Sequence, residues 1–453
     1  MEKQDKKQLT SRNLWGYAIG AIPNGLLVFI FLLKYVQFFY DKLQLAPSLF
    51  VIGQVIYLIV NALNDPLLGQ MSDRTNAQKW GSRRTIYIRY GAPIWGFTFM
   101  LVWIPWSFTN QIVIFFHFVI SICVFDTFFT LVVLVWMALL PEMTSDLDER
   151  NKANLLATIV AAVFVLPMFI IVGSMDPTSE QFILLMLFIA IFSTILLILT
   201  SFMCKERPEF QKDKGLPLLK AVKETLKMKS YLLYIAYIFC DAFIGSIGLS
   251  YLFVYLLILG EGGLLFYFAI FFFIGYGSNF FYIKMRPKWG MRKIILRSGF
   301  SNVIITLILF PFIILIDAPI LVVITLAIRT FLGGYSVFNT PIMYLSIDED
   351  ELKTGSRREG MFLGINALFN KPAQSIGPII ATIVLSIFGY IQNSDFQPDS
   401  AFIGIKILMF LVPAIINAIG LTFMYFYPLH GESLNQLQEK LRLLHAEKRG
   451  RIE

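Results

Sequence analysis

The segment Lys79–Ile86 (KWGSRRTI) and the segment Lys288–Ile295 (KWGMRKII) carry the same motif, which therefore occurs twice in this chain of 453 residues. The first copy follows the second long apolar stretch of the chain, and the second copy follows the eighth, which is the second stretch of its own half. A second pair supports the match, because the charged loop 141–151 is echoed by the charged loop 348–359. The sequence therefore predicts two related halves, separated by the charged segment Lys205–Lys229.

The composition is that of an integral membrane protein. Hydrophobic residues make up 57% of the chain and charged residues 15%, with 44 Phe, whereas a soluble domain has about 25% charged residues. These values exclude a soluble enzyme for most of the chain. The net charge of +8 does not indicate nucleic-acid binding, because most Lys and Arg lie in short loops between apolar runs. Cys123, Cys204 and Cys240 have neither disulfide nor metal-site spacing.

Apolar stretches of about 20 residues predict helices that span the bilayer. Twelve are expected, at 14–40, 47–71, 87–107, 111–140, 153–175, 181–204, 230–259, 263–284, 293–316, 318–346, 359–390 and 401–427. Most basic residues fall in the termini and the even-numbered loops, which predicts that both termini are cytoplasmic. We expect a multi-pass protein of the plasma membrane.

The domain organisation follows from these spans. We expect an N-terminal six-helix half (1–204), a cytoplasmic linker (205–229), a C-terminal six-helix half (230–427) and a cytoplasmic tail (428–453). Equal topology in the two halves is a parallel repeat, as in the major facilitator fold. The predicted class is an all-α membrane protein with twelve transmembrane helices, acting as a monomer among membrane lipids, with the substrate site between the halves.

Span 2 carries the strongest polar cluster. Asn61, Asn64 and Asp65 share one helix face, and Pro66 frees a backbone carbonyl. A carboxylate with two amides can bind a small cation, a proton or a substrate. The alternative is that these side chains hydrogen-bond neighbouring helices.

Four further ionisable residues lie near the middle of their spans, where charge is costly and therefore marks candidate functional residues. They are Asp126, Asp241, Arg329 and Lys371. Asp126 is a candidate for cation or substrate binding, and Arg329 and Lys371 are candidates for substrate binding; structural ion pairs, such as Asp241 with Lys371, are the alternative. Lys371 is the stronger case because polar residues surround it on span 11, namely Asn366, Asn370 and Gln374.

Other polar and aromatic residues are weaker candidates. Asn24 is either a substrate ligand or a helix–helix hydrogen bond, and Trp136 either stacks on a sugar ring or packs against other helices. Lys34 and His117 lie toward the outer ends of their spans, which favours snorkelling to the membrane interface.

The charged loops suggest a cytoplasmic gate. Side chains of these loops can pair with helix ends and close the inner side in one state, although membrane orientation alone also explains the positive charges. The gating candidates are Asp73, Arg74, Arg83, Arg84, Arg357 and Arg358. No hydrolytic constellation, phosphate-binding loop or metal-ligand cluster is evident, so we expect neither an enzyme nor an ATP-driven pump, and no cofactor beyond a coupling ion, H⁺ or Na⁺.

These motifs resemble those of the glycoside-pentoside-hexuronide:cation symporters of the major facilitator superfamily. The resemblance lies in Asn64–Gly69 with Asp73–Thr75 and Trp80–Arg84, and in Asp350–Gly360 with Lys371. Pro141 and Glu142, with Asp146 and Arg150, fit the loop after span 4 of that family. The resemblance covers essentially the whole chain and implies a sugar or glycoside carrier coupled to a cation.

The chain departs from that family at three acids. Sodium-coupled members typically have acids where this chain has Asn61 and near Val133, and a sugar-binding acid near Asn24 or Gly25. With one carboxylate on the span 2 face, we expect coupling to protons or no coupling, rather than coupling to sodium. A lysolipid carrier of the same superfamily, or a membrane receptor or scaffold that does not transport, are the alternatives.

Overall fold

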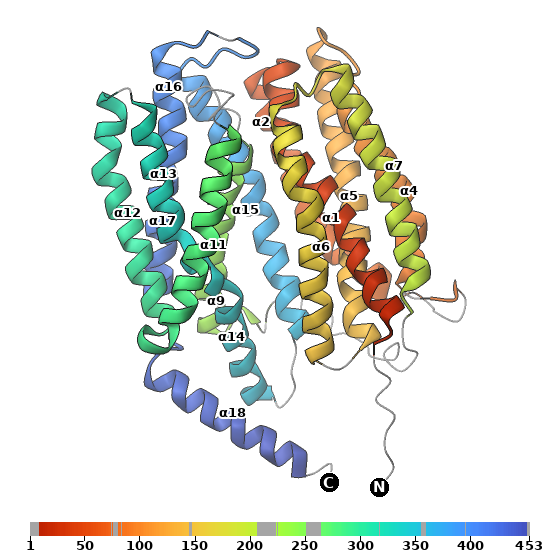
Figure 1. Cartoon of the computed structure of the whole chain (residues 1–453), viewed down its shortest axis with the longest axis vertical. Helices are drawn as coiled ribbons and strands as arrows, with labels where there is room; N and C mark the ends of the chain where they lie inside the picture. The colour runs from red at the N-terminus through yellow and green to blue at the C-terminus, as the bar shows by residue number, and fades with distance from the viewer. Residues whose placement is uncertain are drawn as a thin grey trace. The chain divides into compact units, whose positions relative to one another are not determined.

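The computed structural model describes residues 9–73, 75, 80–82, 84–144, 147–205, 223, 225–250, 264–316, 318–354, 359–394 and 396–450. The described chain is helical and contains no strand, which confirms the predicted all-α class. It divides into two compact units, an N-terminal unit containing α1 to α7 and a C-terminal unit containing α9 to α18. Figure 1 shows the helices, with the colour running from red at the N-terminus to blue at the C-terminus.

The helices of the N-terminal unit are bounded by residues suited to helix ends. Thr10, Asn110 and Ser179 each accept a hydrogen bond from a backbone N–H of the following turn, which satisfies donors that the helix leaves unpaired. In this unit, α1 packs against α6 and α7, α4 against α5 and α7, and α2 against α5. The elements are α1 (Ser11–Val36), the π-helical η1 (Gln37–Lys42), α2 (Pro47–Asp73), α4 (Thr85–Trp103), α5 (Gln111–Met143), α6 (Leu147–Ser174) and α7 (Glu180–Met203).

The C-terminal unit contains several helices that change pitch. Gly333 and Gly334 separate the α-helical and 3-10 parts of one such helix, and Pro413 follows a π-helical segment in another. The elements are α9 (Lys229–Ser250), α11 (Leu264–Trp289), α12 (Met291–Leu315), α13 (Pro319–Gly333), η4 (Gly334–Phe338), α14 (Asn339–Thr354), α15 (Glu359–Ile387), α16 (Asp399–Lys406), η5 (Ile407–Leu411), α17 (Val412–Tyr425) and α18 (Glu432–Gly450).

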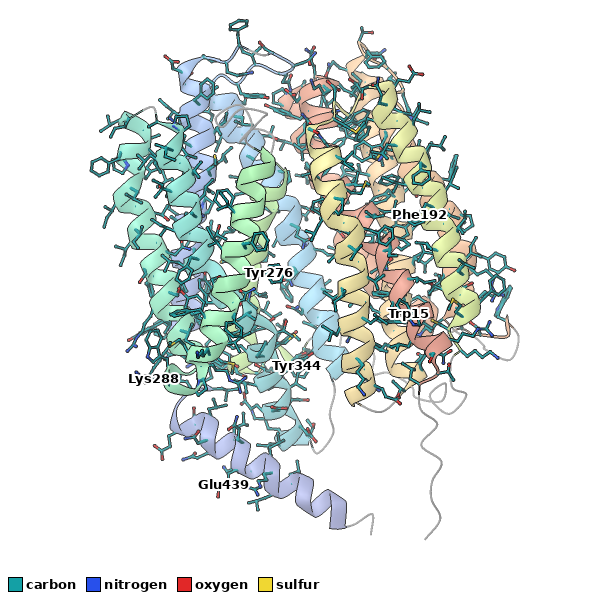
Figure 2. All side chains as sticks on the ribbon, viewed as in Figure 1. Trp15, Phe192, Tyr276, Lys288, Tyr344 and Glu439 are labelled. Carbon is teal, nitrogen blue, oxygen red and sulfur yellow. The ribbon has the colours of Figure 1, made fainter. Side chains whose placement is uncertain are left out.

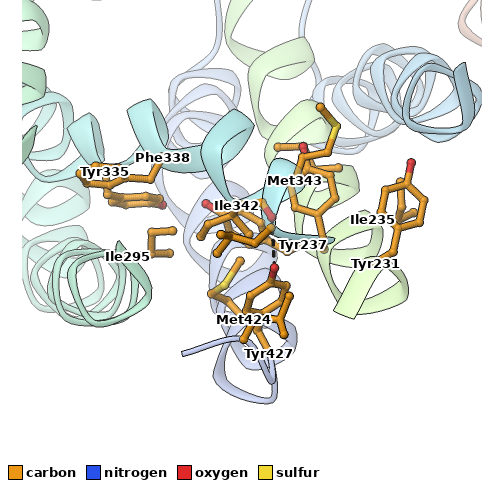
Figure 3. Packing of buried hydrophobic residues seen from close by; sticks show 14 of the residues in the cluster. Tyr231, Ile235, Tyr237, Ile295, Tyr335, Phe338, Ile342, Met343, Met424 and Tyr427 are labelled. Carbon is orange, nitrogen blue, oxygen red and sulfur yellow. Dashed lines mark hydrogen bonds between the residues drawn. The ribbon is translucent and has the colours of Figure 1, made fainter. Parts of the chain in front are cut away.

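The core of the C-terminal unit is rich in tyrosine. Figure 3 shows Tyr231, Tyr237, Tyr335 and Tyr427 among buried hydrophobic side chains of α9, α12, η4, α14 and α17. The hydroxyl of Tyr427 donates to the carbonyl oxygen of Ile342 at 3.1 Å. Buried phenols need such partners, so this core fixes helix positions by hydrogen bonds as well as by packing.

The outer surfaces of the helices are apolar. In the described part of the chain, nine helical segments are long and apolar enough to cross a membrane. Large side chains such as Trp15 and Tyr276 are exposed on them (Figure 2). A bilayer covers such surfaces, whereas a soluble monomer rarely exposes apolar area on this scale.

The glycine of the repeated motif has the same φ in both units. Gly81, just before α4, and Gly290, just before α12, each have a φ of 74°. This left-handed region is costly for any residue with a Cβ, which explains a glycine at this point of both copies.

The tail was expected only as a cytoplasmic extension, and its helix α18 was not predicted. Leu434, Leu437, Leu441 and Leu444 recur at spacings of three and four residues there, so the signal was present in the sequence.

Candidate functional site in the N-terminal unit

One face of α2 presents three polar side chains toward α5. Tyr57, Asn61 and Asn64 lie four and three residues apart, which places them on the same side of the helix. Close approach of the two helices is possible because Gly53 of α2 lies against the ring of Phe118; a Cβ at Gly53 would come within 2.6 Å of that ring. The side chains of Asp65 and Pro66 lie outside the described part of the structure.

Asp126 of α5 receives two of these side chains. Its carboxylate is 2% exposed, with Oδ1 3.1 Å from the hydroxyl of Tyr57 and Oδ2 2.9 Å from Nδ2 of Asn64. Thr127 Oγ1 is 3.4 Å from Asn64 Oδ1 and 2.8 Å from the carbonyl oxygen of Cys123. The carboxylate is therefore oriented by hydrogen bonds to both of its oxygens.

Asn61 adds an acceptor to this cluster. It lies between Tyr57 and Asn64 on the same face of α2, and its Oδ1 is buried with no hydrogen-bond partner among the described residues. A buried acceptor without a donor costs about 1–3 kcal/mol. The cluster thus has capacity for an added donor or a small cation, to which carboxylate and amide oxygens are suitable ligands.

A second polar cluster joins three helix ends. Arg84, just before α4, donates from Nε to Glu142 Oε1 at 2.9 Å and from Nη1 to Ser72 Oγ at 2.5 Å. Arg84 and Glu142 are both 6% exposed. Arg84 therefore contacts an acid of a neighbouring helix end, one of the arrangements expected for a gate. Arg74, Arg83, Arg357, Arg358 and the side chain of Asp73, the other gating candidates, lie outside the described residues.

The loop after α5 is anchored beside this cluster. Glu149 accepts from the backbone N–H of Leu9 at 2.9 Å and from the hydroxyl of Thr144 at 2.5 Å. Arg150 Nε donates to the carbonyl oxygen of Thr144 at 2.8 Å. Both ends of this loop are therefore held by specific hydrogen bonds.

Two candidate substrate residues of the N-terminal unit, Trp136 and Asn24, have different surroundings. Trp136 stacks on Tyr17, with ring centroids 4.5 Å apart, and its Nε1 donates to the carbonyl oxygen of Tyr17 at 3.2 Å, so one ring face is used for packing. Asn24 is half-buried in α1, and its amide oxygen and nitrogen have no hydrogen-bond partner among the described residues. Asn24 therefore has no hydrogen bond to a neighbouring helix in this part of the chain.

The snorkelling interpretation of Lys34 and His117 is wrong. Lys34 is 1% exposed and donates to Gln37 Oε1 and to the carbonyl oxygens of Gly173 and Met175 at 2.7–3.0 Å. His117 is fully buried, bonded to the carbonyl oxygen of Leu101 at 2.8 Å and stacked on Trp106. Internal acceptors at the helix ends replace the membrane interface for both side chains.

The remaining candidates belong to the C-terminal unit. The guanidinium of Arg329 on α13 donates to the carbonyl oxygen of Met409 and lies 5.4 Å from the ring centre of Phe410. Lys371 and Asn370 are half-buried on α15. Asp241 accepts from Nδ2 of Asn339 at 3.0 Å and forms no ion pair with Lys371.

Several residues of these clusters were not predicted. Tyr57 lies four residues before Asn61 on the same helix face, so its position was readable, but a tyrosine in an apolar span normally indicates packing. The sequence around Glu142 indicated only that it belongs to the loop motif after span 4. Tyr237, which donates to Asn339 Oδ1 at 2.9 Å, carried no signal that separated it from the other tyrosines of α9.

Comparisons with known proteins agree with this architecture. The family model described as MFS/sugar transport protein matches residues 16–431. An uncharacterized symporter of Synechocystis sp. is 24% identical, with 93% of this chain and 94% of that protein aligned. The glucuronide carrier protein homolog of Escherichia coli is 23% identical, with 95% of each chain aligned.

Two further similarities are more limited: one covers only part of each protein, and the other concerns the fold alone. Transmembrane protein 180 of Gallus gallus is 28% identical, but the match covers 31% of this chain and 29% of that protein; for the Mus musculus protein the shares are 34% and 33%. A bacterial homolog of the human lysosomal transporter Spinster, solved inward-facing and unoccupied, superposes with a TM-score of 0.64 at 12% identity, covering 94% of this chain and 98% of that one. The expected major facilitator fold is confirmed.

Proposed function

We propose that this chain, which belongs to the family of MFS/sugar transport proteins, carries a sugar or glycoside across the plasma membrane together with a cation. Membrane transport rather than catalysis is the activity of the family. A sugar as the solute is supported by the description of the family, and coupling by the relative named a symporter. Alternating access of the two units, with both termini cytoplasmic, is the mechanism that the repeat favours.

The observation that carries the coupling proposal is the carboxylate of Asp126 between Tyr57 and Asn64. A buried carboxylate is costly to keep charged, and its charge is readily cancelled by a proton or a small cation. Among the described residues, Asp126 is the only acid beside Asn61 and Asn64. We therefore favour a proton over sodium, which usually requires more charge from its ligands.

The site residues have distinct roles in this proposal. Asp126 of α5 binds the coupling ion together with Asp65, which follows Asn64 in the sequence of α2. Asn61 and Asn64 supply neutral ligands. Lys371 and Asn370 of α15, with Arg329, Asn24 and Trp136, are the proposed substrate residues. Trp136 contributes through the ring face that Tyr17 does not cover.

The test uses purified protein in liposomes. A thermal-shift screen with pentosides, hexosides, glucuronides and lysolipids first selects a solute, because a ligand that binds the folded state raises its melting temperature. We expect an inward proton gradient to drive accumulation of a selected sugar. Asp126→Asn should lose accumulation but retain exchange of labelled for unlabelled sugar, whereas Asp399→Asn, an exposed acid at the start of α16, should behave as wild type.

Three results would contradict the proposal. Accumulation driven by sodium at constant pH would assign the wrong ion. Normal accumulation by Asp126→Asn would assign the wrong residue. Stabilisation by lysolipids alone would favour the lysolipid carrier, and the absence of any bound or transported solute would favour a receptor or scaffold.

The Arg84–Glu142 pair is the proposed inner gate of the N-terminal unit. If it forms in one transport state only, Arg84→Gln should shift the population toward the other state. Labelling of a single cysteine in the inner cavity measures this shift, and unchanged labelling in a folded variant would leave Arg84 a purely structural residue.

A further inference from the structure

Asp241 is a carboxylate of the C-terminal unit that the proposed coupling site does not use. It lies in the middle of α9 and is partly buried. Asn339 of α14 donates to its Oδ2 at 3.0 Å, and Tyr237 donates to Asn339 Oδ1 at 2.9 Å. The amide is thereby fixed with its nitrogen toward the carboxylate, so the orientation of Asp241 is determined by two neighbouring side chains.

No described side chain balances the charge of Asp241. Its Oδ1 accepts no hydrogen bond from a described residue, and in the same part of the chain no lysine or arginine lies within ion-pair distance. Transfer of a carboxylate from water to such a site costs several kcal/mol unless a cation or a proton compensates. Asp241 therefore needs a second group during at least part of its cycle.

The packing of α9 against α15 places Lys371 at the depth of Asp241. The hydroxyl of Tyr231 donates to the carbonyl oxygen of Phe362 at 2.5 Å, and Ser246 lies against Gly377. These two contacts are equally spaced along both helices, so the helices run parallel in constant register. Asp241 is ten residues beyond Tyr231, and Lys371 is nine beyond Phe362, a difference of about 1.5 Å along the axes.

The other titratable groups within electrostatic range of Asp241 are phenols and a thiol, which are weak acids. They are Tyr234, Tyr237 and Cys240 on α9 and Tyr335 on η4. On the α17 side, Gly420 faces Cys240. Arg329 is the next cation, and it interacts with Tyr335. Lys371 reaches the depth of Asp241, but it lies about 180° around α15 from Phe362, which contacts α9, so its side chain leaves α15 on the face away from Asp241.

We propose that Asp241 is a second proton-binding site, located in the C-terminal unit. A proton from water binds at Oδ1 and neutralises the charge, while Oδ2 keeps the hydrogen bond from Asn339. When the proton returns to water, that hydrogen bond stabilises the charged carboxylate. Only the role of this proton in transport rests on the proposed function, because proton binding itself can be measured without any solute.

The experiment follows the carboxyl group directly. Full-length protein is labelled with carbon-13 in its aspartate side-chain carboxyls, and infrared difference spectra are recorded between about pH 5 and pH 9. We expect a band of protonated aspartic acid that disappears as the pH rises. Asp241→Asn, which preserves the shape of the side chain, should remove the contribution of one carboxyl from that band, whereas Asp399→Asn should leave the band unchanged.

A further variant tests the neighbour. Asn339→Ala removes the donor that stabilises the charged carboxylate, so Asp241 should bind its proton about tenfold more tightly and the band should persist to higher pH. This variant also serves if Asp241→Asn does not fold. An unchanged band in Asp241→Asn, or in Asn339→Ala if only that variant folds, would overturn the proton site. That result leaves the sugar-uptake test of the proposed function unaffected.

Discussion

At the scale of single residues, Lys34 joins α1 to the end of α6. Its ammonium donates to the carbonyl oxygens of Gly173 and Met175, which the end of α6 leaves without helical donors. A cation at a helix C-terminus also interacts favourably with the helix dipole. We expect Lys34→Met to lower the free energy of unfolding by about 2 kcal/mol, because two buried acceptors lose a charged donor.

The matched control is Lys42→Met. Lys42 pairs with Asp176 at 2.8 Å, but both side chains are partly exposed, and such pairs contribute about 0–1 kcal/mol. Thermal unfolding in one detergent compares the two variants. An equal loss of unfolding free energy in both variants would contradict the prediction, because the three hydrogen bonds of Lys34 would then contribute no more than an exposed ion pair.

Asn61 is the residue at which the ion preference can be changed. It lies on the same face of α2 as Tyr57 and Asn64, which contact Asp126. The sodium-coupled symporters that this chain resembles typically have an acid at this position. Asn61→Asp should add the missing negative charge and create a site at which sodium raises the melting temperature. The wild type should show no such shift. Choline chloride at equal ionic strength is the control, and identical sodium responses of the two proteins would contradict the prediction.

Much of this candidate site could be predicted from polarity in apolar spans. Asn61, Asn64 and Asp126 were identified because such residues are costly in a bilayer, and the structure brings Asn64 into contact with Asp126. Their connection through Tyr57 was not predictable, because tyrosine is common in packed helices. The pairing of Asp241 with Asn339 depends on which faces of α9 and α14 meet, and no spacing within either helix contains that information.

At the scale of elements, the repeated glycines set the start of two equivalent helices. Gly81→Ala and Gly290→Ala should each cost about 1–2 kcal/mol of stability, because both positions have a φ of 74°. Gly364→Ala in α15 is the control, since no described atom outside its own helical turns lies within 4 Å of the position that its Cβ would take, and alanine favours a helix. Melting temperatures of the three variants test this. A loss in Gly364→Ala as large as in the other two would contradict the backbone explanation.

Apolar runs predicted where helices lie but not where their pitch changes. The predicted span 318–346 contains α13, η4 and the start of α14, and the span 401–427 contains α16, η5 and α17. Hydropathy is the same in an α-helix and a π-helix, so an average over about 20 residues cannot distinguish them. The change at η5 accompanies contacts from another helix, because Arg329 of α13 donates to the carbonyl oxygen of Met409 there.

At the scale of the whole molecule, each unit has its own core. The N-terminal unit buries Trp95 and Trp103 completely, and the C-terminal unit buries the tyrosine-rich cluster around Tyr231 and Tyr237. A segment with its own core can fold as a unit, and the charged sequence between the two halves is where a domain boundary is expected. The repeat in the sequence predicts the same division, because each half carries its own copy of the motif.

We therefore expect a chain divided between Lys214 and Gly215 to form a complex from two separately encoded halves. Each half retains all of its predicted spans, and the bilayer supplies the environment that a membrane helix requires before helices associate. Co-expression with a tag on the N-terminal half should co-purify the untagged C-terminal half, and the pair should melt cooperatively. A half ending at Gly173, which lacks α7 and loses the packing of α7 against α1 and α4, is the control and should be degraded. Recovery of either full half only as aggregate, with its partner present, would show that the units do not fold independently.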